Sequence, residues 1–174
     1  MPPAGADLPP RAENRTISVY FRAAAMLRVS KLTDYATVVM SVLAEAGSEV
    51  LSAQVLAERA RLEIPTVSKL LKQLVHSGLV ESFRGVNGGY RLAREPAAIS
   101  VAEIVVAMEG PIGMTECSVT SGLCDHENHC GVRGNWQRIN QAIAEALASV
   151  TLADMMKPPG PKRPVPTPLR VALA

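Results

Sequence analysis

The chain has 174 residues, of which 48 % are hydrophobic but only 3 % aromatic, so its core must consist mainly of Leu, Val, Ile, Ala and Met. No stretch approaches the roughly 18 uncharged apolar residues of a transmembrane helix, and the N-terminus lacks the apolar run of a secretory signal, so we expect a cytoplasmic protein with no membrane partner. The abundance of Ala and Leu, both strong helix formers, favours a mainly α-helical fold.

The net charge of +2 is unevenly distributed along the chain. Residues 59–94 hold seven basic and two acidic residues, whereas residues 95–130 hold six acidic residues and neither Lys nor Arg. A basic block beside an acidic block predicts one surface for a polyanion and a second segment with a different task.

The two ends of the chain differ in composition from the middle. Residues 1–25 are rich in Pro, Ala and Arg and are predicted to be a disordered extension, with Met26 as the expected true start. The Pro-rich residues 157–174 are predicted to be a disordered tail. Between them we expect a helix-rich domain at 26–110, a loop at 111–131 and a C-terminal helical region at 132–156.

Three helices are predicted in the helix-rich domain. The first spans about 33–46, with Thr33 as its N-cap, an apolar face at helical spacing and Gly47 as its end. The second begins after Ser52, another N-cap residue. The third runs from about Pro65 to Ser77, because proline is tolerated in the first turn of a helix, and Gly78 ends it.

The third helix has two different faces. One is an apolar stripe of Ile64, Val67, Leu71 and Leu74. The other is polar and carries no acid; it consists of Thr66, Ser68, Lys69, Lys72, Gln73 and His76. A solvated face usually mixes both signs of charge, so an acid-free face favours contact with nucleic acid.

A β-hairpin is predicted next, with strands at 79–84 and 90–92 around a Gly-rich turn. We expect the Gly88–Gly89 pair to adopt positive φ in this tight connection. The turn lacks the Gly-x-x-x-x-Gly-Lys pattern of a nucleotide-binding loop. Three helices followed by a hairpin predict a mainly α winged helix-turn-helix domain.

In such a domain the third helix enters the major groove of double-stranded DNA. We expect Thr66, Ser68 and Lys69 to meet base edges, and Lys72 and Arg91 to contact phosphates, which position the protein without reading sequence. Arg84 and Asn87, in the hairpin, are expected on phosphates or in the adjacent minor groove.

A short fourth helix is expected over 100–109, closed by Gly110–Pro111. Farther along, the apolar residues Trp136, Ile139, Ile143, Ala146 and Val150 recur at heptad-like spacing. One helix cannot bury such a stripe against so small a core, so we expect it to pair with a second copy in a homodimer. Packing against its own domain is the alternative.

The cysteines Cys117, Cys124 and Cys130 form a C-x6-C-x5-C pattern in the loop. An odd number in a reducing compartment argues against a disulfide, whereas a metal centre would organise a segment with few apolar residues. The spacing lacks the close pairs of structural zinc sites and suits an iron–sulfur cluster. Zinc completed by His126 or His129, a thiol sensor and unligated cysteines are the alternatives. Asp34 from a partner chain is a further candidate for the fourth ligand.

These motifs together resemble the iron–sulfur cluster regulators typified by IscR and NsrR, with the closest likeness to regulators of the SUF cluster-assembly operon. The resemblance covers roughly residues 26–156. It rests on Lys31-Leu-Thr-Asp-Tyr-Ala36, Leu56-Ala57, Ile64-Pro-Thr-Val-Ser-Lys-Leu-Leu71, Arg84-Gly-x-x-Gly-Gly-Tyr90 and the three cysteines.

The resemblance implies a homodimer that binds a pseudo-palindromic promoter site, and a cluster, [2Fe–2S] favoured over [4Fe–4S], that tunes its DNA affinity. IscR-like members have a histidine three residues after the last cysteine, where this chain has Arg133. NsrR-like members use an aspartate from the other subunit at the position of Asp34.

We therefore expect a repressor of iron–sulfur assembly genes that is not an enzyme and has no small-molecule substrate. The alternatives are a nitric-oxide- or redox-responsive regulator on the same scaffold, a small iron–sulfur electron-transfer protein, and a zinc-stabilised interaction protein.

Overall fold

The computed structural model describes residues 29–119, 122, 124–125 and 129–158. The predictions of disorder at 1–25 and over nearly all of 157–174 fall outside these residues, as do Met26, His126 and the side chain of Cys117. Within the described part of the chain, no helix has the length and apolar character needed to cross a membrane.

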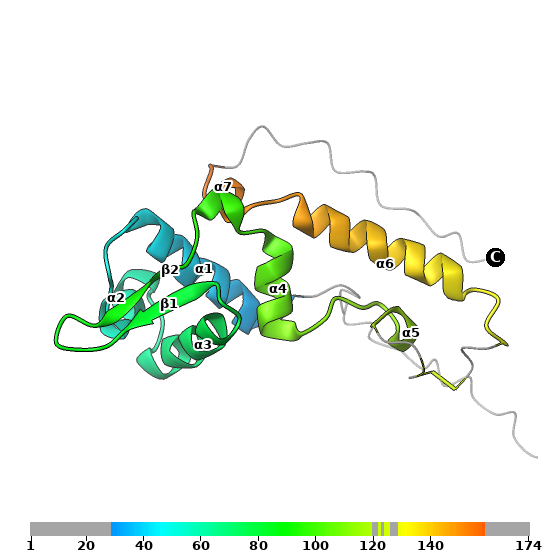
Figure 1. Cartoon of the computed structure of the whole chain (residues 1–174), viewed down its shortest axis with the longest axis horizontal. Helices are drawn as coiled ribbons and strands as arrows, with labels where there is room; N and C mark the ends of the chain where they lie inside the picture. The colour runs from blue at the N-terminus through cyan, green and yellow to red at the C-terminus, as the bar shows by residue number, and fades with distance from the viewer. Residues whose placement is uncertain (1–28, 120–121, 123, 126–128, 159–174) are drawn as a thin grey trace, which may run out of the picture.

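The elements follow one another as a helical domain, a hairpin and a helical extension. In chain order they are α1 (Lys31–Glu45), α2 (Ala53–Ala60), α3 (Ile64–His76), β1 (Val80–Phe83), β2 (Gly89–Leu92), the 3₁₀ turn η1 (Pro96–Ala98), α4 (Val101–Glu109), α5 (Glu116–Val119), α6 (Arg133–Ala148) and α7 (Leu152–Met155). Figure 1 shows α1, α2, α3 and the hairpin at one end, α5 at the other, and the long helix α6 spanning the extension. This arrangement is a winged helix-turn-helix, which confirms the predicted fold class.

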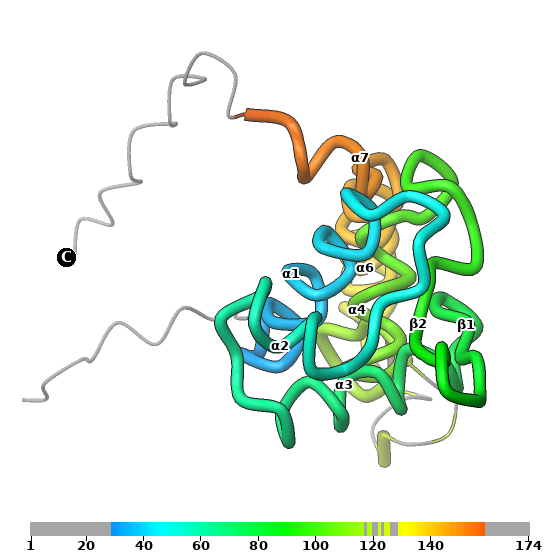
Figure 2. The backbone as a smooth tube through the Cα atoms, turned by 90° about the vertical axis from the view of Figure 1, so that its left-hand side faces the viewer, coloured from blue at the N-terminus to red at the C-terminus, as the bar shows by residue number. Residues whose placement is uncertain are grey.

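One hydrophobic core joins the helical domain, the hairpin and helix α7. Met40 of α1, Leu56 of α2, Leu71 of α3 and Ile104 of α4 are fully buried in it. Leu152 of α7 is also fully buried, and its backbone N–H donates to the carbonyl of Ile99 at 2.8 Å. The chain therefore returns to the helical domain after α6, and α4 packs against both α1 and α6 (Figures 1 and 2).

Helix α1 begins two residues earlier than predicted. Its N-cap is Ser30, whose hydroxyl accepts from the backbone N–H of Thr33 at 3.3 Å. The prediction that Thr33 is the N-cap is therefore wrong. Thr33 is buried, and its hydroxyl donates instead to the carboxylate of Glu109 at the end of α4. The N-cap residues Ser52, Ser100 and Thr151 each accept from the backbone N–H three residues on, as such residues do.

Helix α3 has the predicted polarity except at its first residue. Val67, Leu70, Leu71 and Leu74 are buried, and Gly78 ends the helix with φ +72°. Ile64, expected in the apolar stripe, is 49 % exposed. It is the first residue of the helix and lies largely in solvent, so that part of the prediction is wrong.

The hairpin is held against the helical domain by its second strand. Val80 pairs with Leu92 and Phe83 with Gly89, while Tyr90 exchanges two backbone hydrogen bonds with Leu51, of 2.8 and 3.0 Å. The predicted positive φ at Gly88–Gly89 is wrong: in the turn, Gly85 takes it, with φ +113°. A Cβ on Gly89 would lie 2.4 Å from the carbonyl oxygen of Leu51, so this glycine is required for close approach of two backbones.

Replacing Gly89 with alanine should lower the free energy of unfolding by about 1–3 kcal/mol, the usual effect of overpacking. The added methyl group meets backbone atoms, so the hairpin must move away from Leu51. Gly134→Ala is the control, because a Cβ there meets no atom within 4 Å. Urea unfolding measures both, and equal stability of the two variants would contradict the prediction.

Candidate functional site

The outward face of α3 is basic and exposed. Ser68, Lys69, Lys72 and His76 are exposed, and the buried residues of the helix lie on its opposite side. Thr66 and Gln73 lie between these two faces and are half-buried. The helix contains no acidic residue, so its accessible surface is suited to an anionic partner.

The tip of the hairpin carries the second group of predicted residues. Arg84 and Asn87 are exposed, and Val86 between them is fully exposed at 105 %. The tip projects from the domain on the left of Figure 1, and strand β1 packs on α3. The polar face of α3 and the hairpin tip together are called the basic surface.

Arg91, predicted as a phosphate contact, is engaged within the hairpin. Its guanidinium donates to Glu81 across the strands at 2.9 Å and lies 5.0 Å from the centroid of the Phe83 ring. An exposed ion pair of this kind contributes only about 0–1 kcal/mol. The interaction holds the side chain in place, and its exchange for a phosphate would cost little.

The loop that carries the cysteines is fixed to α6 by Asn140. The amide of Asn140 donates to the carbonyl of Ile112 at 3.1 Å and accepts from the backbone N–H of Met114 at 3.2 Å. Helix α5 also packs on α6. Asn140 was not among the residues predicted from the sequence, where its signal is an amide side chain beside the apolar stripe of a helix.

The structure places the ligand candidates unevenly. Cys124 and Cys130 are free, half-buried thiols, and His129 is exposed next to Cys130. Cys117 belongs to α5, and Asp34 is exposed in the first turn of α1. The described side chains do not include those of Cys117 and His126, and among them no group of three His, Cys, Asp or Glu residues lies close enough to hold a metal ion. Soft thiolates in a loop are nevertheless the donor chemistry of an iron–sulfur cluster.

Glu109 connects the start of the cysteine loop to α1. It is the last residue of α4 and accepts from the backbone N–H of Ser30 at 3.0 Å and from the hydroxyl of Thr33. The hydrogen bonds from Ser30 and Thr33 hold the pKa of Glu109 below its ordinary value. This contact, here called the α1–α4 latch, ties the turn of α1 that carries Asp34 to the residue before the loop.

Replacing Glu109 with glutamine should make stability less dependent on pH. Because the folded-state pKa is lowered, the carboxylate stabilises the native state above its ordinary value of 4.5, and this contribution is lost as pH falls through the lower folded value. The latch is near the surface, so the difference at neutral pH should be below about 1 kcal/mol.

Urea unfolding from pH 3 to pH 7, about the range in which carboxylates titrate, measures this effect. The variant Thr33→Val removes one of the two donor residues and should reproduce part of the change. Parallel stability profiles of the wild type and Glu109→Gln would contradict the role of the latch.

Comparison with known proteins agrees with this geometry. The model of the Rrf2 family, described as an iron-dependent transcriptional regulator, matches residues 29–158. A candidate HTH-type transcriptional regulator of Neisseria meningitidis is 35 % identical over 114 residues, which cover 66 % of this chain and 75 % of that protein.

Solved structures of the same fold are similar in both sequence and shape. CymR, the global cysteine regulator of B. subtilis, is 33 % identical, with a TM-score of 0.58 over 75 % of this chain and 96 % of its own. IscR of T. potens is 35 % identical, with a TM-score of 0.56 over 75 % of this chain and 86 % of its own. The chain therefore belongs to the Rrf2 family of transcriptional regulators; it is a DNA-binding protein and not an enzyme.

Proposed function

We propose that this regulator senses cluster status through a [2Fe–2S] cluster and represses iron–sulfur assembly genes of the SUF type. The observation that carries the proposal is the position of the three-cysteine loop. It connects α4 to α6, is bracketed to α6 by Asn140, and begins directly after the α1–α4 latch. A change in the loop can therefore act on three helices of the domain.

The three thiolates of Cys117, Cys124 and Cys130 would hold the cluster. When bound, such a cluster would be the part of the protein that responds to the cell, because oxidation or iron shortage removes it. The fourth ligand is Asp34 of the partner subunit, His126 or His129. Arg133, where a histidine ligand would stand in IscR-like proteins, opens α6 with a cation instead.

The basic surface would bind promoter DNA. Thr66, Ser68 and Lys69 are proposed to reach base edges in the major groove, and Lys72 a phosphate. Arg84 and Asn87 would extend the contact from the hairpin, and Arg91 would join them by exchanging Glu81 for a phosphate.

The exposed apolar face of α6 supports a homodimer. No residue of α6 is buried, and Trp136 and Ile139 are 36 % and 45 % exposed although α4 and α5 pack on the same helix. The alternative of packing only on its own domain leaves this stripe in water. Pairing with a second copy would cover it and present two α3 helices to two half-sites.

Cluster gain or loss would then change DNA affinity through the dimer. The loop joins α4 to α6, and α4 packs on α1 and α3. A loop ordered by a cluster would favour one relative placement of α6 and the DNA-binding domain, and an empty loop another. The spacing of the two recognition helices would shift between these two states.

Purification without oxygen tests the cluster directly. We expect a coloured protein with about two iron and two sulfide per chain, as a [2Fe–2S] cluster requires. Replacing Cys124 or Cys130 with serine should abolish the colour, and single replacement of Asp34, His126 or His129 by alanine should identify the fourth ligand. Asp125→Ala is the control, because Asp125 is an exposed loop residue. A colourless protein loaded with zinc would refute the cluster.

A nitric-oxide-responsive regulator on the same scaffold is the second candidate. The observation in its favour is Asp34, which is exposed in the first turn of α1 and available to a partner subunit. If nitric oxide releases the wild-type protein from promoter DNA and iron depletion does not, this candidate replaces the first. If iron depletion releases the protein and nitric oxide does not, the assembly-gene regulator is retained.

A further inference from the structure

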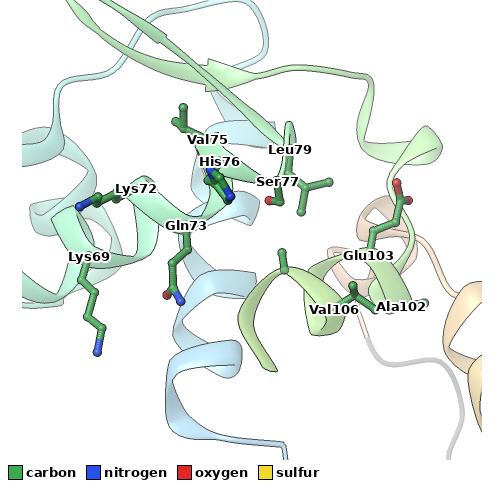
Figure 3. Close-up of a pocket in the computed structure, with 11 residues that line it drawn as sticks. Lys69, Lys72, Gln73, Val75, His76, Ser77, Leu79, Ala102, Glu103 and Val106 are labelled. Carbon is green, nitrogen blue, oxygen red and sulfur yellow. The ribbon is translucent and has the colours of Figure 1, made fainter. Parts of the chain in front are cut away.

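A groove of about 1070 Å³ lies between the second half of α3 and helix α4 (Figure 3). Its size is that of sites that bind small molecules. The proposed DNA-binding and cluster-binding functions leave its α4 wall without a role.

The α4 wall of the groove is apolar. It is lined by Ala102, Val106 and Ala107, together with Leu79, the residue that precedes β1. Val106 is 45 % exposed, a large value for a valine in the middle of a helix that packs on α1, α3 and α6. This surface can therefore take up the apolar body of a ligand.

The α3 wall of the groove is positively charged. Lys69, Lys72 and His76 line it and are exposed, and within the described part of the chain no ion pair occupies either lysine. Glu103 is the acid that lines the groove, but its carboxylate already accepts from Arg94 at 2.6 Å and from the backbone N–H of Ser100 at 2.9 Å. The uncompensated charge in the groove is therefore positive.

Gln73 adds a polar group without a partner. Its Oε1 atom is buried and has no hydrogen bond to any of the described residues. Figure 3 shows its amide extending from α3 on the same side as the side chain of Lys69. Buried amide oxygens are normally hydrogen-bonded, and a small rotation of this side chain toward the groove that it lines would let a ligand donate to it.

We propose that the groove binds a small organic anion with an apolar body. The anionic group would lie at Lys69 and Lys72, the apolar part on Val106 and Leu79, and a hydrogen-bonding group at Gln73. Because both lysines also belong to the basic surface, such a ligand would compete with DNA. The competition with DNA rests on the proposed function, whereas binding of the ligand does not.

Two fluorescent probes with related aromatic bodies test the charge and the apolar wall separately. The first is 1-anilinonaphthalene-8-sulfonate, an anion, and the second is N-phenyl-1-naphthylamine, which is neutral. The double variant Lys69→Ala/Lys72→Ala should weaken the anionic probe at least about tenfold, close to 1.4 kcal/mol, and leave the neutral probe nearly unchanged. Val106→Gln should weaken both probes.

The matched control is Ile139→Gln on α6, because Ile139 and Val106 are both 45 % exposed. If Ile139→Gln abolishes binding and Val106→Gln has no effect, the probes bind α6 and the groove proposal is overturned. If Val106→Gln instead changes the oligomeric mass in sedimentation, the groove is an interface between copies of the chain, and the proposal is again overturned.

Competition with duplex DNA separates the two proposals. Displacement of the anionic probe by DNA is the result expected if both hold. If the probe binds as described but DNA binds without displacing it, the ligand site stands and the DNA-binding role of Lys69 and Lys72 fails. If DNA depends on the lysines but the probe does not, the ligand site fails alone.

Discussion

Replacing Leu71 with alanine should lower the free energy of unfolding by about 2–5 kcal/mol, the usual loss for a buried leucine. The side chain of Leu71 is completely buried, with an exposed fraction of 0 %. It packs in the hydrophobic core that joins α1, α2 and α3. The loss has two parts. The first is the free energy of transferring the removed methyl groups from water into the core, and the second is the cost of the cavity that remains because the surrounding helices cannot close up completely.

Lys72→Ala is the matched control for this prediction, because it removes side-chain atoms from the same helix one residue later, on the exposed side. It should change the stability by less than about 0.5 kcal/mol, as surface substitutions usually do. Urea titration followed by circular dichroism measures both variants. Similar losses for the two would show that α3 does not present Leu71 to the core.

Removing Lys72 and Arg84 together should weaken DNA binding by about 10- to 100-fold at moderate salt, because two phosphate-neutralising charges are lost. Both side chains are exposed, one on α3 and one at the hairpin tip. Each neutralised phosphate releases counterions, so each single alanine variant should also reduce the slope of log affinity against log salt by about 1.

Fluorescence anisotropy between about 50 and 200 mM salt measures these slopes. Arg138→Ala is the control, since Arg138 is an exposed cation on α6, away from the basic surface. It should leave the slope unchanged. If all three single variants lower affinity equally, the effect comes from net charge alone and the proposed DNA surface is wrong.

The local parts of the fold were predictable from the sequence. Ser52 and Gly78 mark helix ends through interactions within a few residues, and the period of Val67, Leu71 and Leu74 fixes which side of α3 is buried. The acid-free polar face follows from the same period. The positions of Lys69 and Lys72 on an exposed face were therefore predictable, because burial of one face dictates the other.

The wrong predictions depend on partners distant in the sequence. Thr33 looks like an N-cap, but Glu109 from α4 binds its hydroxyl. Gly89 looks like a turn residue with positive φ, but the backbone of Leu51 approaches it. The ion pair of Arg91 with Glu81 on the neighbouring strand also depends on strand pairing, and the phosphate contact of Arg91 stays a prediction.

The sequence by itself determined the winged-helix pattern, the polarity of α3 and the three-cysteine loop, because helical period, capping and residue spacing are local. Only the tertiary structure decided that Glu109 ties α4 to α1, that Asn140 brackets the loop on α6, and that α3 and α4 enclose a groove. These features need side chains from elements that meet only when the common core forms, and no local pattern specifies that meeting.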